Sequence, residues 1–139
     1  MTSSSITYGN ESEPKGLLVI VSCDSIIVEP YEDVSLEVLQ DLVGGYIERV
    51  PLPSDSHTDM WVNENGISLE LPPNLLATRY YRRVWCKPYD ANMTLFGVAV
   101  FTGGDDRRAT PLSTTVVDAL LLDLIDPQQW LTAEGLSLN

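Results

Sequence analysis

Arginine and tyrosine residues in the middle of this 139-residue chain have the types and spacing to bind an anion. Arg79 and Arg83 are four residues apart, so they share one face of a helix. Tyr80 and Tyr81 lie between them. Guanidinium groups hold phosphates or carboxylates through paired hydrogen bonds, and a tyrosine ring can stack on a base. The predicted set for a nucleotide-like ligand is Arg79, Tyr80, Arg82, Arg83, Arg107 and Arg108. The commoner alternative is that these arginines form ion pairs with acidic neighbours.

Acidic side chains are the second candidate group, because they could bind a macromolecule. The chain has 20 Asp and Glu residues against 8 Lys and Arg residues, a formal net charge of -12. Such a charge argues against direct binding to duplex DNA or to an anionic membrane, since both need clustered positive charge. Rows of carboxylates can imitate DNA phosphates and occupy a basic site on another protein, or they can simply keep a protein soluble. The predicted partner-binding set is Glu29, Glu32, Asp33, Glu37 and Asp41.

Catalysis would have to use His57, the only histidine. Asp55 and Asp59 flank it, but this loop is polar, and exposed loops seldom hold a general base in place. Cys23 and Cys86 have no metal-ligand spacing, and the glycine pairs match neither a P-loop nor a dinucleotide fingerprint. We therefore expect no catalytic residue, no metal and no cofactor, and an enzyme ranks below both kinds of binding protein.

Hydrophobic patterns predict the elements that position these side chains. The continuous apolar run Gly16–Cys23 indicates a strand covered on both faces, and residues 25–28 either continue it or return as a hairpin. Ser35 and Gly44 are the expected caps of a helix. Further strands are expected at residues 46–52, at 60–71 as two short runs around a turn at Asn65 and Gly66, and at 93–102. Further helices are expected at 74–83 and 113–124.

This order predicts a single α+β domain with a mixed or antiparallel sheet of four to five strands and about three helices. We expect the domain to span residues 16–126, after a loose tail at 1–15 and before a C-terminal tail at 127–139 that folds back on the core. The start of the chain has no signal-peptide pattern, the apolar runs are far shorter than the ~20 residues of a membrane span, and the two cysteines are expected to be free thiols. These features predict a cytoplasmic location.

Four motifs carry a family resemblance: LQDLVGGYIERV (39–50), MWVNENG (60–66), LPPNLLAT (71–78) and FGVAVFTG (96–103). Together they resemble a small family of unknown function known mainly from actinobacteria, their phages and their plasmids. The resemblance covers residues 17–104, and neither the run Arg79–Arg83 nor the C-terminal helix belongs to its pattern. It implies a mobile-element accessory protein that interferes with host machinery or defence.

The sequence thus predicts a non-catalytic phage-type protein that binds a host macromolecule, such as a nucleic-acid-binding protein, through its acidic residues. The alternative is a small-ligand binder that captures an anionic nucleotide.

Overall fold

The computed structural model describes residues 16–54, 56–86, 91–104 and 108–125. Its elements are the strands β1 (Leu17–Val21), β2 (Ile26–Pro30), β3 (Ile47–Val50), β4 (Asp59–Asn63), β5 (Ala99–Gly104) and β6 (Ala109–Thr110), the α-helices α1 (Leu36–Val43), α2 (Leu75–Val84) and α3 (Thr114–Ile125), and a short 3-10 helix, Ala91–Met93. The expected tails at 1–15 and 127–139 lie outside the described residues, as does Pro127, the expected stop after α3.

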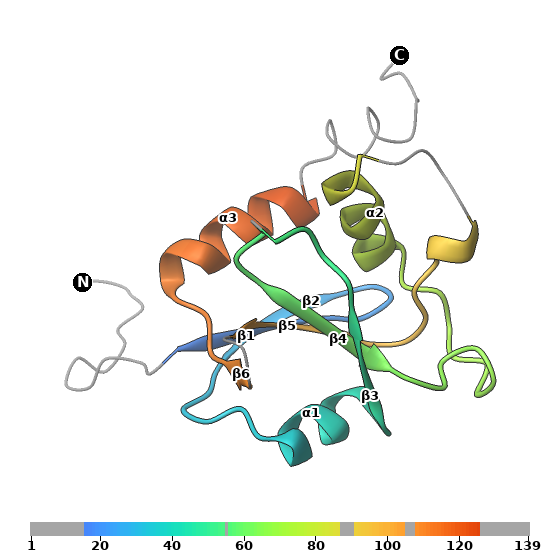
Figure 1. The fold of residues 1–139 in the computed structure, drawn as a ribbon, viewed down its shortest axis with the longest axis horizontal. Helices are drawn as coiled ribbons and strands as arrows, with labels where there is room; N and C mark the ends of the chain where they lie inside the picture. Colours follow the sequence, from blue (N-terminus) through green and yellow to red (C-terminus); the bar gives the residue numbers. More distant parts are fainter. Residues whose placement is uncertain (1–15, 55, 87–90, 105–107, 126–139) are drawn as a thin grey trace.

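An antiparallel sheet forms the centre of the domain. Its strand order is β2-β1-β5-β4-β3, and the short β6 pairs with the end of β5. Helices α2 and α3 cover one face of the sheet and α1 covers the other (Figure 1). The expected α+β class is therefore confirmed. The strand β6 was not predicted, because two residues are too few to give a hydrophobic pattern.

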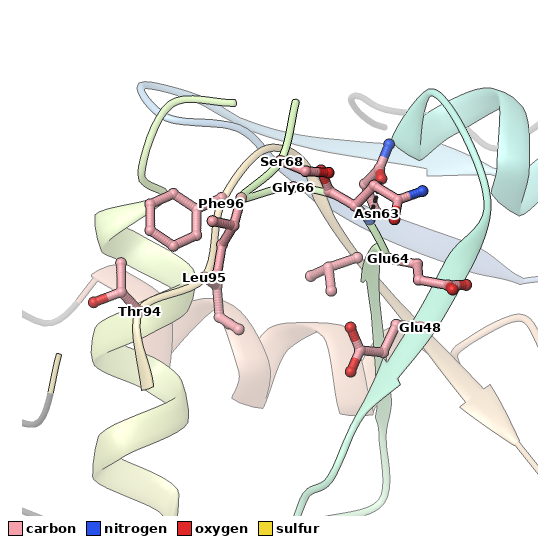
Figure 2. Close-up of a pocket in the computed structure, with 11 residues that line it drawn as sticks. Glu48, Asn63, Glu64, Gly66, Ser68, Thr94, Leu95 and Phe96 are labelled. Atoms are coloured by element: carbon pink, nitrogen blue, oxygen red, sulfur yellow. Dashed lines mark hydrogen bonds between the residues drawn. The ribbon is translucent and has the colours of Figure 1, made fainter. Parts of the chain in front are cut away.

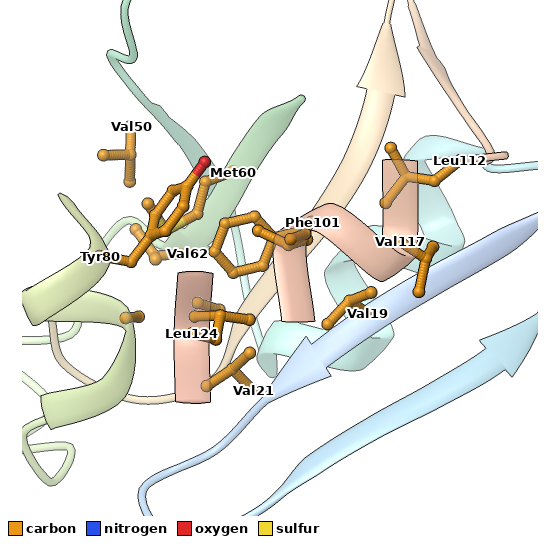
Figure 3. Close-up of a cluster of buried hydrophobic side chains, with 13 residues drawn as sticks. Val19, Val21, Val50, Met60, Val62, Tyr80, Phe101, Leu112, Val117 and Leu124 are labelled. Atoms are coloured by element: carbon orange, nitrogen blue, oxygen red, sulfur yellow. The ribbon is translucent and has the colours of Figure 1, made fainter. Parts of the chain in front are cut away.

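Two hydrophobic clusters lie on opposite faces of the sheet. Val19 and Val21 of β1 pack with Phe101 beneath α2 and α3 (Figure 3), whereas Leu18 and Ile20 pack on the α1 side. Successive side chains of a strand point to opposite faces, so an uninterrupted apolar run is what a strand covered on both sides requires. The prediction for this run is confirmed.

Local signals placed α1 correctly. The Ser35 hydroxyl accepts a hydrogen bond from the Val38 amide at 3.2 Å, which satisfies a free donor of the first turn. Gly44 ends the helix at φ 81° and donates to the Gln40 carbonyl at 2.8 Å. Both predicted caps are confirmed.

The helices α2 and α3 also match their predictions to within one or two residues. Asn74, which is fully buried, caps α2 by accepting from the Ala77 amide at 3.1 Å. Val117, Leu120 and Leu124 form the buried stripe of α3.

The open choice after β1 is settled as a hairpin. Val21 pairs with Ile26 in antiparallel register, and β2 ends at Pro30. This strand forms one edge of the sheet.

The predicted second strand after the Asn65-Gly66 turn is wrong. Residues 64–70 form consecutive turns, in which Leu69 donates to the Asn65 carbonyl at 2.9 Å and Leu71 donates to the Gly66 carbonyl at 3.0 Å. The buried Asn63 side chain starts this turn region, because its amide donates to the Val43 carbonyl at 3.1 Å and its oxygen accepts from the Asn65 amide at 2.7 Å. The strand β4 pairs with β3 and β5 instead of with a hairpin partner.

The strand predicted at 93–102 begins later and includes Gly103 and Gly104, which were expected to close it. Residues before it are held by α2 rather than by another strand. The Leu95 amide donates to the Thr78 hydroxyl at 2.9 Å, and the buried Asn74 side chain donates to the Gly97 carbonyl at 2.8 Å. The early apolar residues of this run therefore pack against a helix.

Candidate functional site

The structure places acidic residues of β2 and α1 on the same side of the sheet as Tyr31. Glu29 is paired with Leu18 in the β1–β2 register, so its side chain leaves the sheet on the α1 side. Partial burial raises the pKa of the Tyr31 hydroxyl, and the Glu29 charge, a hydrogen bond to the Glu29 carboxylate and the Asp41 charge raise it further. Residues 12 positions apart (41 minus 29) thus act on the same hydroxyl.

All five predicted partner-binding residues are exposed, and we call them the acidic patch: Glu29, Glu32, Asp33, Glu37 and Asp41. The sequence contains no Lys or Arg from Gly16 to Glu48, so this segment holds no cation of its own to neutralise the patch. The patch is therefore a concentrated negative surface beside α1.

Apolar side chains are exposed in the same part of the chain. Ile27, Leu36 and Tyr46 are 46%, 58% and 67% exposed. At the C-terminal end of α1, a shallow pocket of about 350 Å³ is lined by Gln40, Asp41, Gly44, Gly45 and Tyr46. Aromatic and aliphatic contacts next to charges are typical of surfaces that bind proteins.

The predicted arginine and tyrosine set is divided by the fold. Tyr80 is only 3% exposed, and its ring packs edge-on against Phe101 with centroids 5.3 Å apart, so it offers no open face to a base. Burial raises the pKa of the Tyr80 hydroxyl. Arg82 is also 3% exposed, whereas Arg79 is half-buried. Arg83 pairs with Asp123 of α3 at 2.9 Å.

Of the remaining two arginines, Arg107 lies outside the described residues. Arg108 immediately precedes β6, which pairs with the end of β5. A nucleotide site made by the whole set remains a prediction, but the geometry gives it little support.

His57 lies at the edge of an open cavity of about 770 Å³ between the β3–β4 connection and Gly104. It is exposed and has a left-handed backbone, with φ 63°. The Asp59 carboxylate lies 3.9 Å from the Arg49 guanidinium. It also lies beside Gly104, where a Cβ atom on residue 104 would collide with it. Asp55 lies outside the described residues. No hydrogen bond joins the imidazole to a side chain within the described ranges.

Comparison with known families adds one match. A family described as a domain of unknown function, DUF3846, matches residues 17–125. The chain belongs to the DUF3846 family. No curated protein and no solved structure matches it.

The DUF3846 match extends the resemblance seen in the sequence. It extends past residue 104 and contains helix α3, so the expectation that the C-terminal helix lies outside the family pattern was wrong. Tyr80 of α2 and Leu124 of α3 belong to the same buried cluster as residues of the sheet strands, so both helices are part of the core of this domain. The family carries no established activity that could assign a site.

Two further properties of this DUF3846 domain bear on its candidate sites. In the described ranges, no helix is long and apolar enough to cross a membrane, and no three His, Cys, Asp or Glu side chains are grouped as metal ligands would be. The two cysteines, predicted to be free thiols, are free and exposed.

Sequence reasoning missed Glu48 and Glu64 of the DUF3846 domain, which face a second pocket. One signal was available: in the alternation of β3, Glu48 shares a face with Val50, which is buried in the core. No local signal pointed to Glu64, because its position depends on the turns that follow β4.

Proposed function

We propose that this protein is a non-catalytic accessory protein that binds a basic surface of a host macromolecule through its acidic patch. The observation that supports the proposal is the exposure of Glu29, Glu37 and Asp41 on the α1 side of the sheet, in a segment that contains no Lys or Arg from Gly16 to Glu48. Carboxylates of β2 and α1 thus share one side of the sheet. A surface of this kind attracts a basic partner at long range and orients it.

The exposed Ile27, Leu36 and Tyr46 support protein binding over a role in solubility alone. A solubility surface gains nothing from exposed apolar groups, whereas an interface uses them to exclude water from its centre. We include in the proposal the phage or plasmid context, which rests on the four resembling motifs, and the imitation of DNA phosphates, which rests on the charge.

Affinity purification from the host with quantitative mass spectrometry tests this function. The test variant carries Glu37→Gln and Asp41→Asn, and the matched control carries Glu70→Gln and Asp118→Asn, which remove two exposed charges elsewhere. We expect a host protein that is recovered with the wild type and the control but depleted with the test variant. If the recovered protein binds nucleic acid, duplex DNA should compete with the wild type for it. Equal recovery with both variants would contradict the proposal.

A further inference from the structure

A second pocket, of about 360 Å³, lies between the β3–β4 ribbon and the segment 94–96 beside α2. Figure 2 shows Leu95 and Phe96 on one side of it and the carboxylates of Glu48 and Glu64 on the other. Val62 also lines it. The pocket therefore joins an apolar wall to an anionic wall.

Hydrogen bonds fix both walls. On the apolar side, the Leu95 amide donates to Thr78 at 2.9 Å and the Leu95 carbonyl accepts from the Asn74 amide at 2.8 Å. On the anionic side, the Glu64 amide donates to the Tyr46 carbonyl at 2.8 Å. Glu48 is paired with Val62 in the β3–β4 register, so both side chains point to the same face. The backbone on both sides of the cavity is thus held in place by the fold.

The two carboxylates are not neutralised from within the described structure. Neither Glu48 nor Glu64 forms an ion pair with a described residue, and no Lys or Arg lines the pocket. Arg49, the next residue along β3, is 3.9 Å from Asp59. Burial raises the pKa of Tyr81, and the charge of Glu48 raises it further, which places that charge toward α2.

We propose that this pocket takes the cationic side chain of a lysine or arginine presented by a protein partner. The methylene stem packs against Val62 and Leu95, and the charged head lies between Glu48 and Glu64. A long basic side chain has this division into an apolar stem and a cationic end, whereas an inorganic cation would leave the apolar wall unused.

This inference rests on the proposed function in one respect, namely that the partner is a basic protein. The two sites lie on opposite faces of the sheet, because Glu48 shares the face of Val50 and Val62 under α2 and α3, whereas α1 covers the other face. A partner that binds both has to pass around the edge strand β3.

NMR titration of the full chain tests the pocket without a partner. The probes are the Nα-acetyl methylamides of arginine and lysine, with the norleucine counterpart as the neutral control. We expect saturable shifts at the amides of Glu64, Gly66, Leu95 and Phe96 with the cationic probes alone. Putrescine distinguishes a protein side chain from a free diamine as the natural ligand. Weaker binding of putrescine than of the arginine and lysine probes indicates a side chain. Tighter binding of putrescine would overturn the assignment in favour of a free diamine.

A double variant, Glu48→Gln with Glu64→Gln, should weaken binding of the arginine probe by at least about tenfold, since charge-assisted bonds are lost. Both side chains are exposed, and an unchanged melting temperature checks the fold. The control variant Glu70→Gln with Asp118→Asn should bind like the wild type. Equal binding by the double variant, or shifts spread over the surface, would overturn the inference. Because the titration uses no partner, failure of the acidic patch to bind a host protein leaves its outcome unaffected.

Discussion

At the scale of single residues, Tyr31 reports most directly on the acidic patch. Burial, the charge of Glu29 with its hydrogen bond, and the charge of Asp41 all favour the neutral form of its hydroxyl, so its pKa is raised. A raised folded-state pKa contributes stability that is fully present below the ordinary tyrosine pKa. That contribution is lost as the pH rises through the folded-state pKa.

We predict that Glu29→Gln lowers the pKa of Tyr31 toward its ordinary value and weakens the decrease in stability at alkaline pH. A ¹³C NMR titration of the tyrosine rings measures the first effect, and urea unfolding over the alkaline range measures the second. Tyr46, which is 67% exposed, is the internal control. An unchanged Tyr31 titration would mean that Glu29 does not lie beside this hydroxyl.

Asn74 is the second residue with a distinct prediction, because it joins three parts of the fold. Its buried side chain donates to the carbonyls of Val21 and Gly97 at 2.9 and 2.8 Å and caps α2. Asn74→Ala should lower the free energy of unfolding by about 2–4 kcal/mol, since it leaves buried carbonyls unpaired. Urea unfolding measures this loss, and the exposed Asn65→Ala should change stability by less than about 0.5 kcal/mol. Equal effects of the two substitutions would refute the role of Asn74.

At the scale of elements, local patterns predicted those parts of the fold that depend on neighbouring residues. The α1 caps Ser35 and Gly44 act within one helical turn, so the sequence was sufficient to find them. The turn region after β4 depends on Asn63 reaching the carbonyl of Val43, a partner 20 residues away. The late start of β5 likewise depends on α2 side chains. Single-sequence patterns contain no information on such tertiary contacts.

The same distinction applies to the candidate sites. The exposure of the acidic patch could be predicted from composition and from the outer positions of an amphipathic helix. Burial of Tyr80 could not, because the helix face it occupies is decided by α3 and Phe101. The pocket beside Glu48 and Glu64 needs three separate segments of the chain to meet.

The contact between α2 and α3 provides the test of the arginine alternative. The Arg83 and Asp123 side chains are 23% and 40% exposed, so a double-mutant cycle should give a coupling of about 0.5–1 kcal/mol in unfolding free energy. Calorimetry with mono-, di- and cyclic nucleotides should give no binding heat that depends on Arg83. No coupling, together with nucleotide binding that is lost in Arg83→Ala, would instead favour the anion site.

At the scale of the whole molecule, carboxylates lie on both faces of the sheet. The acidic patch lies on the side covered by α1 (Figure 1), whereas Glu48 shares the opposite face with Val50, and Arg83 on that side pairs with Asp123. A negative field acts on the encounter with a basic partner more than on the lifetime of the complex. The proposed binding through the acidic patch therefore predicts an effect on the association rate.

The most direct test measures the association rate between the protein and its recovered host partner as a function of ionic strength. We predict that the rate for the wild type falls steeply with salt. The variant carrying Glu32→Gln, Asp33→Asn, Glu37→Gln and Asp41→Asn should associate at least about tenfold more slowly at low salt, with a shallower salt dependence. The Glu70→Gln, Asp118→Asn control should follow the wild type. An association rate that is insensitive to salt and to the four substitutions would contradict the account and leave the acidic patch as a solubility surface.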